Sequence, residues 1–195
     1  MIHYFTMLSY TDLTKGTMFV TDGQPYIVLE YEFLRMQQRR PTTRVKARNL
    51  ITGKTGEYTF QQSGSFAEAE IAKEPLTFLY AHRGEYWFVD PKDQKRRIKF
   101  SEEQIGEQAK YLKPNITVTA YVFNGQIINV ELPIKIDYEV KEAPPSFKGN
   151  TATGGSKTVV LDNGLSLNVP MFINQGDTIR INTQSGEYTE RVEKK

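Results

Sequence analysis

Short runs of β-branched and aromatic residues recur along the chain, and turn-forming pairs that contain glycine separate them. Three of these pairs, Asp22-Gly23, Asn124-Gly125 and Asn163-Gly164, each lie between two apolar runs. Asn or Asp followed by Gly tolerates the positive φ angles of a tight hairpin loop, so each pair predicts a β-hairpin. The chain is therefore expected to be mostly β.

One segment has helical spacing instead. The stretch Ser101–Gln104, with the sequence Ser-Glu-Glu-Gln, matches a capping box. Ile105, Ala109 and Leu112 then follow at helical intervals. These positions predict a short helix or turn beside a barrel.

Frequent turn signals and few helical segments favour small barrels over a βαβ sheet. The apolar pattern breaks at an acidic, alanine-containing stretch near residues 66–71 and again near residues 133–140. We therefore expect an all-β chain of three small barrels, over residues 1–69, 70–135 and 136–195. The second and third segments are compatible with five-stranded barrels of the OB type.

The densest stretch of one charge sign lies between Arg35 and Arg48 and contains no acidic residue. Its cations are Arg35, Arg39, Arg40, Arg44, Lys46 and Arg48. If residues 42–49 form a strand, alternation places Arg44, Lys46 and Arg48 on one face, opposite Thr43, Val45 and Ala47. The first face is then a candidate phosphate-binding strip, and the second packs inward.

The opposing strand of this hairpin is expected over residues 26–34, with Ile27, Leu29, Tyr31 and Phe33 on one face. Residues 36–40, Met-Gln-Gln-Arg-Arg, then form the projecting end. Guanidinium groups fork onto phosphates and stack on bases, so such an end suits structured RNA. The alternative is a strand edge that charge protects against aggregation. The position at a hairpin tip favours RNA.

Composition excludes several classes of protein. Hydrophobic residues are 38% and charged residues 25% of the 195, which is enough for packed cores. There is no cysteine and there are only two histidines, so we expect no disulfide, metal site or cofactor. No run approaches the roughly 18 apolar residues of a membrane span, and the start lacks a secretory pattern, so a cytoplasmic location is expected. The motifs of P-loop enzymes, hydrolases and zinc proteases are absent, so no enzyme is expected.

Two further signals carry weaker interpretations. A second basic cluster follows Asp90-Pro91, and a solvated turn is favoured there over RNA contact. Tyr80 and Trp87 belong to an aromatic stretch in which alternation of core and surface positions is favoured over a base-stacking platform. The cluster consists of Lys92, Lys95, Arg96, Arg97 and Lys99, and the stretch also includes Tyr86 and Phe88.

From about Met7 to Val192 the sequence resembles the elongation factor P (EF-P) family of translation factors. The resemblance to the N-terminal barrel of that family lies in Gly23–Val28, Glu32-Phe33 and Arg44–Gly53. The last segment is similar to the family signature at Lys148–Ala152, Gly154–Lys157, Gly164, Val169-Pro170, Phe172-Ile173, Gly176-Asp177 and Gly186–Val192.

The resemblance implies an N-terminal SH3-like (KOW-type) barrel followed by two OB-fold barrels in an L-shaped, tRNA-like arrangement. It implies a monomer that binds the 70S ribosome between the P and E sites, contacts peptidyl-tRNA, and lies near the messenger RNA in the E site. There it is expected to promote peptide-bond formation at stalling sequences such as consecutive prolines. Proline lacks a backbone N–H and its ring fixes φ, so positioning of the reactants can lower the barrier.

The resemblance also implies that the hairpin tip approaches the CCA end of peptidyl-tRNA. Many family members have a modified lysine or a glycosylated arginine there, whereas a gapless alignment places Gln38 at this position, between Gln37 and Arg39-Arg40. One interpretation is that the factor acts unmodified, with Arg39 and Arg40 supplying the cations, and we favour it. The other is a shifted loop in which Arg39 is the tip. The basic side chains of the hairpin outside the tip, Arg35, Arg44, Lys46 and Arg48, are the expected contacts to the RNA backbone.

The last barrel carries the other expected contacts. Gly149-Asn150-Thr151 matches a loop near the messenger and small subunit that is commonly Gly-Asp-Thr in the family, so a charge is lost here. Tyr188 and Arg191 match a tRNA-contacting pair of the family. Their alternative interpretation is an ordinary strand-end aromatic and a solvated cation.

Overall fold

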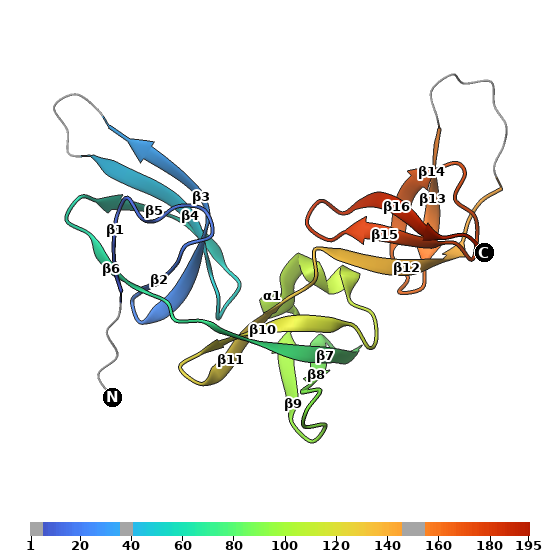
Figure 1. Ribbon diagram of the computed structural model, residues 1–195, viewed down its shortest axis with the longest axis horizontal. Helices are drawn as coiled ribbons and strands as arrows, with labels where there is room; N and C mark the ends of the chain where they lie inside the picture. Colours follow the sequence, from blue (N-terminus) through green and yellow to red (C-terminus); the bar gives the residue numbers. More distant parts are fainter. Residues whose placement is uncertain (1–5, 36–40, 146–154) are drawn as a thin grey trace. The chain divides into compact units, whose positions relative to one another are not determined.

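The computed structural model describes residues 6–35, 41–145 and 155–195. Within these residues the chain forms three β-sheets and very little helix (Figure 1). The all-β class expected from the alternating pattern is confirmed.

The first sheet has the strand order β1-β6-β2-β3-β4-β5. Its strands are β1 (Met7–Ser9), β2 (Met18–Thr21), β3 (Gln24–Leu34), β4 (Thr42–Asn49), β5 (Thr55–Gln61) and β6 (Ser65–Glu68). The second sheet has the order β11-β10-β7-β8-β9. Its strands are β7 (Ala72–His82), β8 (Glu85–Val89), β9 (Arg97–Ser101), β10 (Thr117–Phe123) and β11 (Gln126–Glu131).

The third sheet has the order β14-β13-β12-β15-β16. Its strands are β12 (Lys135–Glu142), β13 (Ser156–Leu161), β14 (Ser166–Pro170), β15 (Thr178–Asn182) and β16 (Glu187–Glu193). Between β9 and β10 lie the helix α1 (Glu102–Ile105) and the 3₁₀-helix η1 (Gly106–Tyr111).

The chain divides into two compact units rather than one unit per sheet. The first unit comprises Met1–Glu74, Phe100–Gly106 and Ala120–Val130, and the second comprises Pro75–Lys99, Glu107–Thr119 and Glu131–Lys195. The second sheet therefore contributes strands to both units. The domain limits 1–69, 70–135 and 136–195 and the L-shaped arrangement stay predictions.

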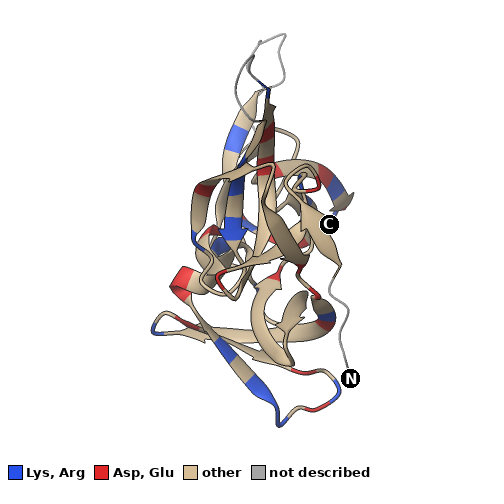
Figure 2. Cartoon of the chain, turned by 90° about the vertical axis from the view of Figure 1, so that its left-hand side faces the viewer, with Lys and Arg blue, Asp and Glu red and all other residues tan. Residues whose placement is uncertain are grey.

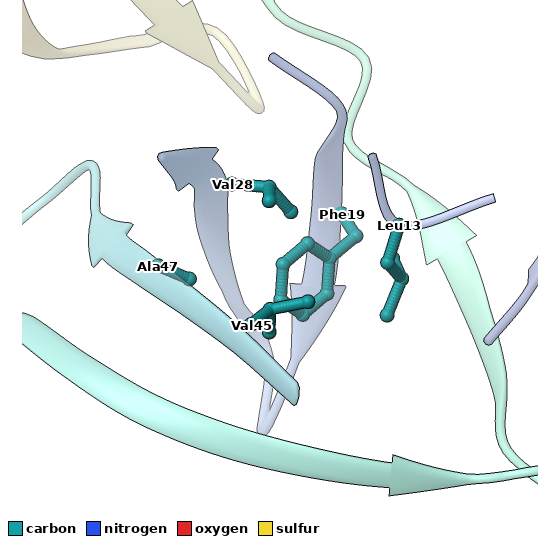
Figure 3. Packing of buried hydrophobic residues seen from close by; sticks show 5 residues of the cluster. All are labelled: Leu13, Phe19, Val28, Val45 and Ala47. Carbon is teal, nitrogen blue, oxygen red and sulfur yellow. The ribbon is translucent and has the colours of Figure 1, made fainter. Parts of the chain in front are cut away.

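The core of the first unit has two parts, and strand β3 contributes to both. Val28 joins the buried cluster around Phe19, which also includes Leu13, Val45 and Ala47 (Figure 3). The neighbouring Ile27 packs against a second cluster, formed by Leu50, Tyr121 and Ile128. Successive strand residues point to opposite faces, so both faces of the β3 root are covered.

The local signals are largely confirmed. Asp22-Gly23 and Asn124-Gly125 form two-residue hairpin loops, with φ angles of 51° and 72° in the first and 49° and 75° in the second. Asn163-Gly164 lies in a longer loop between β13 and β14, where only Gly164 has a positive φ, of 84°. The capping box at Ser101 is present, α1 ends at Ile105, and η1 follows from Gly106.

One prediction about β3 is wrong. Ile27, Leu29, Tyr31 and Phe33 do not share a face, because a β-bulge between Val28 and Glu30 inserts an extra residue. Beyond a bulge the alternation of side chains is reversed. Tyr31 and Phe33 therefore share the face of Val28, and Ile27 lies on the other.

Candidate nucleic-acid interface

The basic segment forms the long hairpin expected from the sequence. Strand β4 begins at Thr42 and ends at Asn49, and it pairs with β3 from Leu34 opposite Thr42 to Tyr26 opposite Asn49. The candidate tip residues Gln37, Gln38, Arg39 and Arg40 lie outside the described residues. Their predicted role therefore stays a prediction, and the described part of the interface begins at Arg35, which is exposed.

The predicted alternation along β4 is confirmed. Thr43, Val45 and Ala47 are buried, whereas Arg44 and Lys46 are exposed and Arg48 is half-buried. Val45 and Ala47 are fully shielded from solvent and belong to the Phe19 cluster. The inward side chains thus fix the strand, and the barrel core holds the three cations on its outer face.

Neighbouring strands place carboxylates beside these cations, which the local sequence did not reveal. Glu32 lies opposite Arg44 and Glu30 opposite Lys46 on β3, and Glu57 lies opposite Lys46 on β5. The Lys46 Nζ is 3.3 Å from Glu30 Oε1. Figure 2 shows basic and acidic positions on adjacent strands.

The neighbouring carboxylates make the three cations of β4 unequal as candidate phosphate contacts. Lys46 has a carboxylate on each side, so RNA phosphates would compete with glutamates for it. Arg44 faces Glu32 and Thr59, and Arg48 faces Ile27 and Thr55. Among the described residues, no ion pair engages either arginine. The two arginines are therefore better placed to bind phosphate than Lys46.

The other face of the hairpin is aromatic where it leaves the core. Tyr31 and Phe33 are 51% and 46% exposed, and the Phe33 ring centroid is 6.1 Å from that of Tyr10. They lie opposite Val45 and Thr43, on the face that is buried nearer the root. The hairpin thus offers RNA a charged face and a face on which bases can stack.

The C-terminal candidates lie on β16, in the second unit. Arg191 is not the solvated cation of the alternative interpretation. Its Nη1 donates to Asp177 Oδ2 at 3.4 Å, and its guanidinium carbon is 5.2 Å from the centroid of the Phe172 ring. Phe172 itself is 55% exposed. Its exposed aromatic ring was not singled out as a site by sequence reasoning.

The carboxylate of Asp177 is only 1% exposed, yet it stays ionised. Burial favours the neutral acid, but the backbone N–H groups of Asn174 and Lys195 and the Arg191 guanidinium outweigh it and hold the pKa of Asp177 below its ordinary value. Asn174 N donates to Asp177 Oδ2 at 2.9 Å. Asp177 thus holds the Arg191 guanidinium by a hydrogen bond, and stacking on Phe172 fixes its orientation.

An open groove of about 910 Å³ lies beside Phe172, the ring on which Arg191 stacks. Phe172 and Tyr188 line it, together with Gly155 and Ser156. The candidate loop Gly149, Asn150 and Thr151 lies outside the described residues, which resume at Gly155. Aromatic rings along an open groove beside an oriented guanidinium suit an RNA strand.

The described residues contain no group of three or more His, Asp or Glu side chains placed to hold a metal ion. In the same part of the chain, no helix has the length and apolar character needed to cross a membrane.

Comparisons with known proteins agree with these features. A model of the EF-P KOW-like domain matches residues 9–66, one of the EF-P OB domain matches residues 71–130, and one of the EF-P C-terminal region matches residues 136–191. Elongation factor P of Dictyoglomus thermophilum is 38% identical over 186 residues, which cover 95% of this chain and all of that protein.

Elongation factor P of Clostridium perfringens is 37% identical, with coverage of 95% of this chain and 100% of that protein. A solved structure of eukaryotic translation initiation factor 5A from Methanococcus jannaschii is 16% identical, with a TM-score of 0.46 over 66% of this chain and 98% of that one. That likeness is too weak to bear on function.

The domain models and the relatives that the chain matches are those of a translation factor rather than of a classical enzyme. The chain belongs to the elongation factor P family. The expected KOW-like and OB domains are confirmed, and the family implies the ribosome as a partner in general terms.

Proposed function

We propose that this protein binds the ribosome between the P and E sites, contacts peptidyl-tRNA, and promotes peptide-bond formation at stalling sequences such as consecutive prolines. In this proposal it acts as a cytoplasmic monomer, and its last barrel lies near the messenger RNA in the E site. It forms and breaks no bond itself. Positioning alone can lower a reaction barrier by several kcal/mol, so the chemistry remains that of the ribosome.

The observation that carries the proposal is a match to elongation factor P along nearly the whole chain, on a fold with a basic hairpin. The described root of the hairpin is hydrogen-bonded on both sides, because β4 pairs with both β3 and β5 along its length. Such a root is the kind of support that catalysis by positioning requires.

The proposed tip chemistry follows from the residues there. Glutamine can donate and accept hydrogen bonds but carries no charge, and it cannot undergo lysine-directed modification. We propose that Gln38 makes hydrogen bonds to the CCA end, and that Arg39 and Arg40 supply cations to its phosphates. We further propose that the barrels are arranged in an L, which would let Tyr188, Arg191 and the loop with Asn150 reach the tRNA and messenger.

The test is the translation of a Pro-Pro-Pro reporter in a reconstituted system with and without the protein. We expect full-length product to appear faster when the protein is present, and a reporter without prolines to be unaffected. RNA binding without rescue would instead support a paralogue or a free OB/SH3-type RNA-binding protein. Intact mass measurement of the natively expressed chain tests the unmodified tip, which a mass increment within residues 35–41 would overturn.

A further inference from the structure

The second sheet presents an aromatic pair on the face that is not buried in its barrel. After a bulge between Phe78 and Tyr80, Tyr80 lies opposite Trp87. Their ring centroids are 6.3 Å apart and the ring planes differ by 25°. Tyr80 is 44% exposed, whereas Phe88 on the other face is fully buried. The alternation expected from the sequence is present, and it leaves this pair outside the core.

A cation adjoins the pair. The Lys99 Nζ lies 5.7 Å from the centroid of the Trp87 ring, and it is held there by Glu85 Oε1 at 2.6 Å. Arg97, on the same strand and face as Lys99, is exposed. Cross-strand pairing also places His82 opposite Glu85 at the end of the hairpin.

The loop between β8 and β9 adds positive charge. Its two aspartates are used by the loop itself, because Asp90 Oδ1 accepts from Lys92 N at 2.8 Å and Asp93 Oδ1 accepts from Lys95 N at 3.0 Å. The side chains of Lys92 and Lys95 are exposed, and in the described parts of the chain they form no ion pair. The ammonium groups of Lys92 and Lys95 thus stay available on the loop that joins β8 to β9.

We propose that the exposed face of β7, β8 and β9 is a second RNA-binding surface, which takes unpaired bases of a single strand. The Tyr80–Trp87 pair accepts a base by stacking, and Arg97 contacts the flanking phosphate, whereas Lys99 must first exchange its Glu85 partner for a phosphate. OB folds commonly bind oligonucleotides on the second and third strands of their own barrel and on the adjoining loops. Stacking tolerates any base, so the surface selects for unpaired strands rather than for sequence. This contact goes beyond the proposed function, because it uses neither the hairpin nor the C-terminal groove.

The chain contains a single tryptophan, so indole emission reports this surface alone. The full-length protein is titrated with a fluorescein-labelled single-stranded oligoribonucleotide of about eight residues, a typical site size for an OB fold. We expect saturable quenching of Trp87 emission that tracks the anisotropy of the label. The same sequence in duplex form should not quench.

Variants separate stacking from folding. Tyr80→Ala should raise the Kd reported by Trp87 quenching by about 5- to 150-fold, the range that loss of one stacked base implies. Tyr80→Phe, which keeps the ring, should bind as the unchanged protein does. Ile134→Ala, at an exposed apolar position outside this surface, is the matched control.

Three results would overturn the proposal. The first is the absence of Trp87 quenching, whether or not anisotropy reports binding elsewhere. The second is equal quenching by single strand and duplex, or an unchanged Kd in Tyr80→Ala. The third is equal quenching by polyglutamate, which would indicate a surface for acidic proteins.

Discussion

At the scale of single residues, the contact between Arg191 and Asp177 has two consequences. Asp177 is buried, and its oxygens accept from Asn174 N, Lys195 N and Arg191 Nη1 at 2.9, 3.3 and 3.4 Å. Arg191 therefore stabilises the third barrel as well as carrying a predicted tRNA contact. A loss of function after substitution of Arg191 does not by itself identify a tRNA contact, so the stability of each variant must be measured alongside.

Asp177→Asn should lower the free energy of unfolding by about 1.5–3 kcal/mol at pH 7, because charge-assisted hydrogen bonds to a buried carboxylate are lost. The pKa of Asp177 is lower in the folded state than in the unfolded state. Its contribution is therefore complete above the unfolded value of about 3.9 and is lost as the pH falls through the folded value. Urea unfolding at pH 7 and at pH 3 measures both effects.

The difference in stability between the unchanged protein and Asp177→Asn should shrink as the pH falls below about 4. Glu139→Gln is the control, because Glu139 forms an exposed pair with Lys141 and should change stability little at either pH. Equal stability of Asp177→Asn and the unchanged protein at pH 7 would show that the hydrogen bonds to Asp177 contribute nothing.

At the scale of elements, the hairpin gives different surroundings to cations that look equivalent in the sequence. Arg44 and Lys46 are two residues apart on the same face of β4. Only Lys46 has carboxylates on both neighbouring strands, at Glu30 and Glu57. Register therefore decides which positive charge is available to RNA.

Arg44→Ala should weaken ribosome binding and reduce the slope of log K against log salt by about one, as the loss of one phosphate contact does. Lys46→Ala should reduce the slope by much less, because its charge is already compensated. Ribosome binding measured over a range of salt concentrations compares the two. In a Glu30→Gln background the effect of Lys46→Ala should grow. An equal reduction of the slope in both alanine variants would refute the claim that Arg44 binds phosphate better than Lys46.

The elements also show how far sequence reasoning reaches. The turn at Asp22-Gly23, the limits of β4 and the capping box at Ser101 follow from local rules about φ angles, alternation and helix ends, so they were predictable. The bulge in β3 was not, because it depends on how Val28 and Glu30 pair with another strand. For the same reason, the sequence around Lys46 does not show that Glu30 and Glu57 lie beside it.

The same distinction between local sequence and strand pairing applies to the candidate sites. The basic hairpin could be found from charge and period alone. The partner of Arg191 could not, because Asp177 lies 14 residues away and meets it only when β15 and β16 pair. The outward-facing Tyr80–Trp87 pair could not be found without the register of β7 and β8, since a one-residue shift would have turned it toward the core.

At the scale of the whole molecule, overall charge cannot account for binding to RNA. The formal net charge is only +2 on 195 residues, so a long-range field contributes little. In the proposed function, affinity would come from local clusters, namely the hairpin, the third barrel and the surface around Trp87. The proposed function further requires that the clusters differ in role, because contacts far from the reacting groups supply binding whereas the tip positions the reactants.

This division predicts two kinds of defect in Pro-Pro-Pro rescue. Arg39→Ala, at the tip, should lower the maximal rate of rescue by about 10-fold and leave the half-saturating concentration nearly unchanged, because positioning acts on the rate. Tyr188→Ala, in the C-terminal groove, should raise the half-saturating concentration by about 5- to 150-fold with little change in the maximal rate, because a stacking contact acts on affinity.

The measurement is the rescue rate as a function of factor concentration, with Ile134→Ala as the control for exposed surface. Gln38→Lys, which restores the lysine common in the family, distinguishes the two interpretations of the tip. If Gln38 is the tip residue, this variant should change the maximal rate, because a charge is added at the CCA end. If Arg39→Ala and Gln38→Lys both leave the maximal rate unchanged, residues 37–40 do not position the reactants, and the tip assignment falls while binding through the third barrel can still stand.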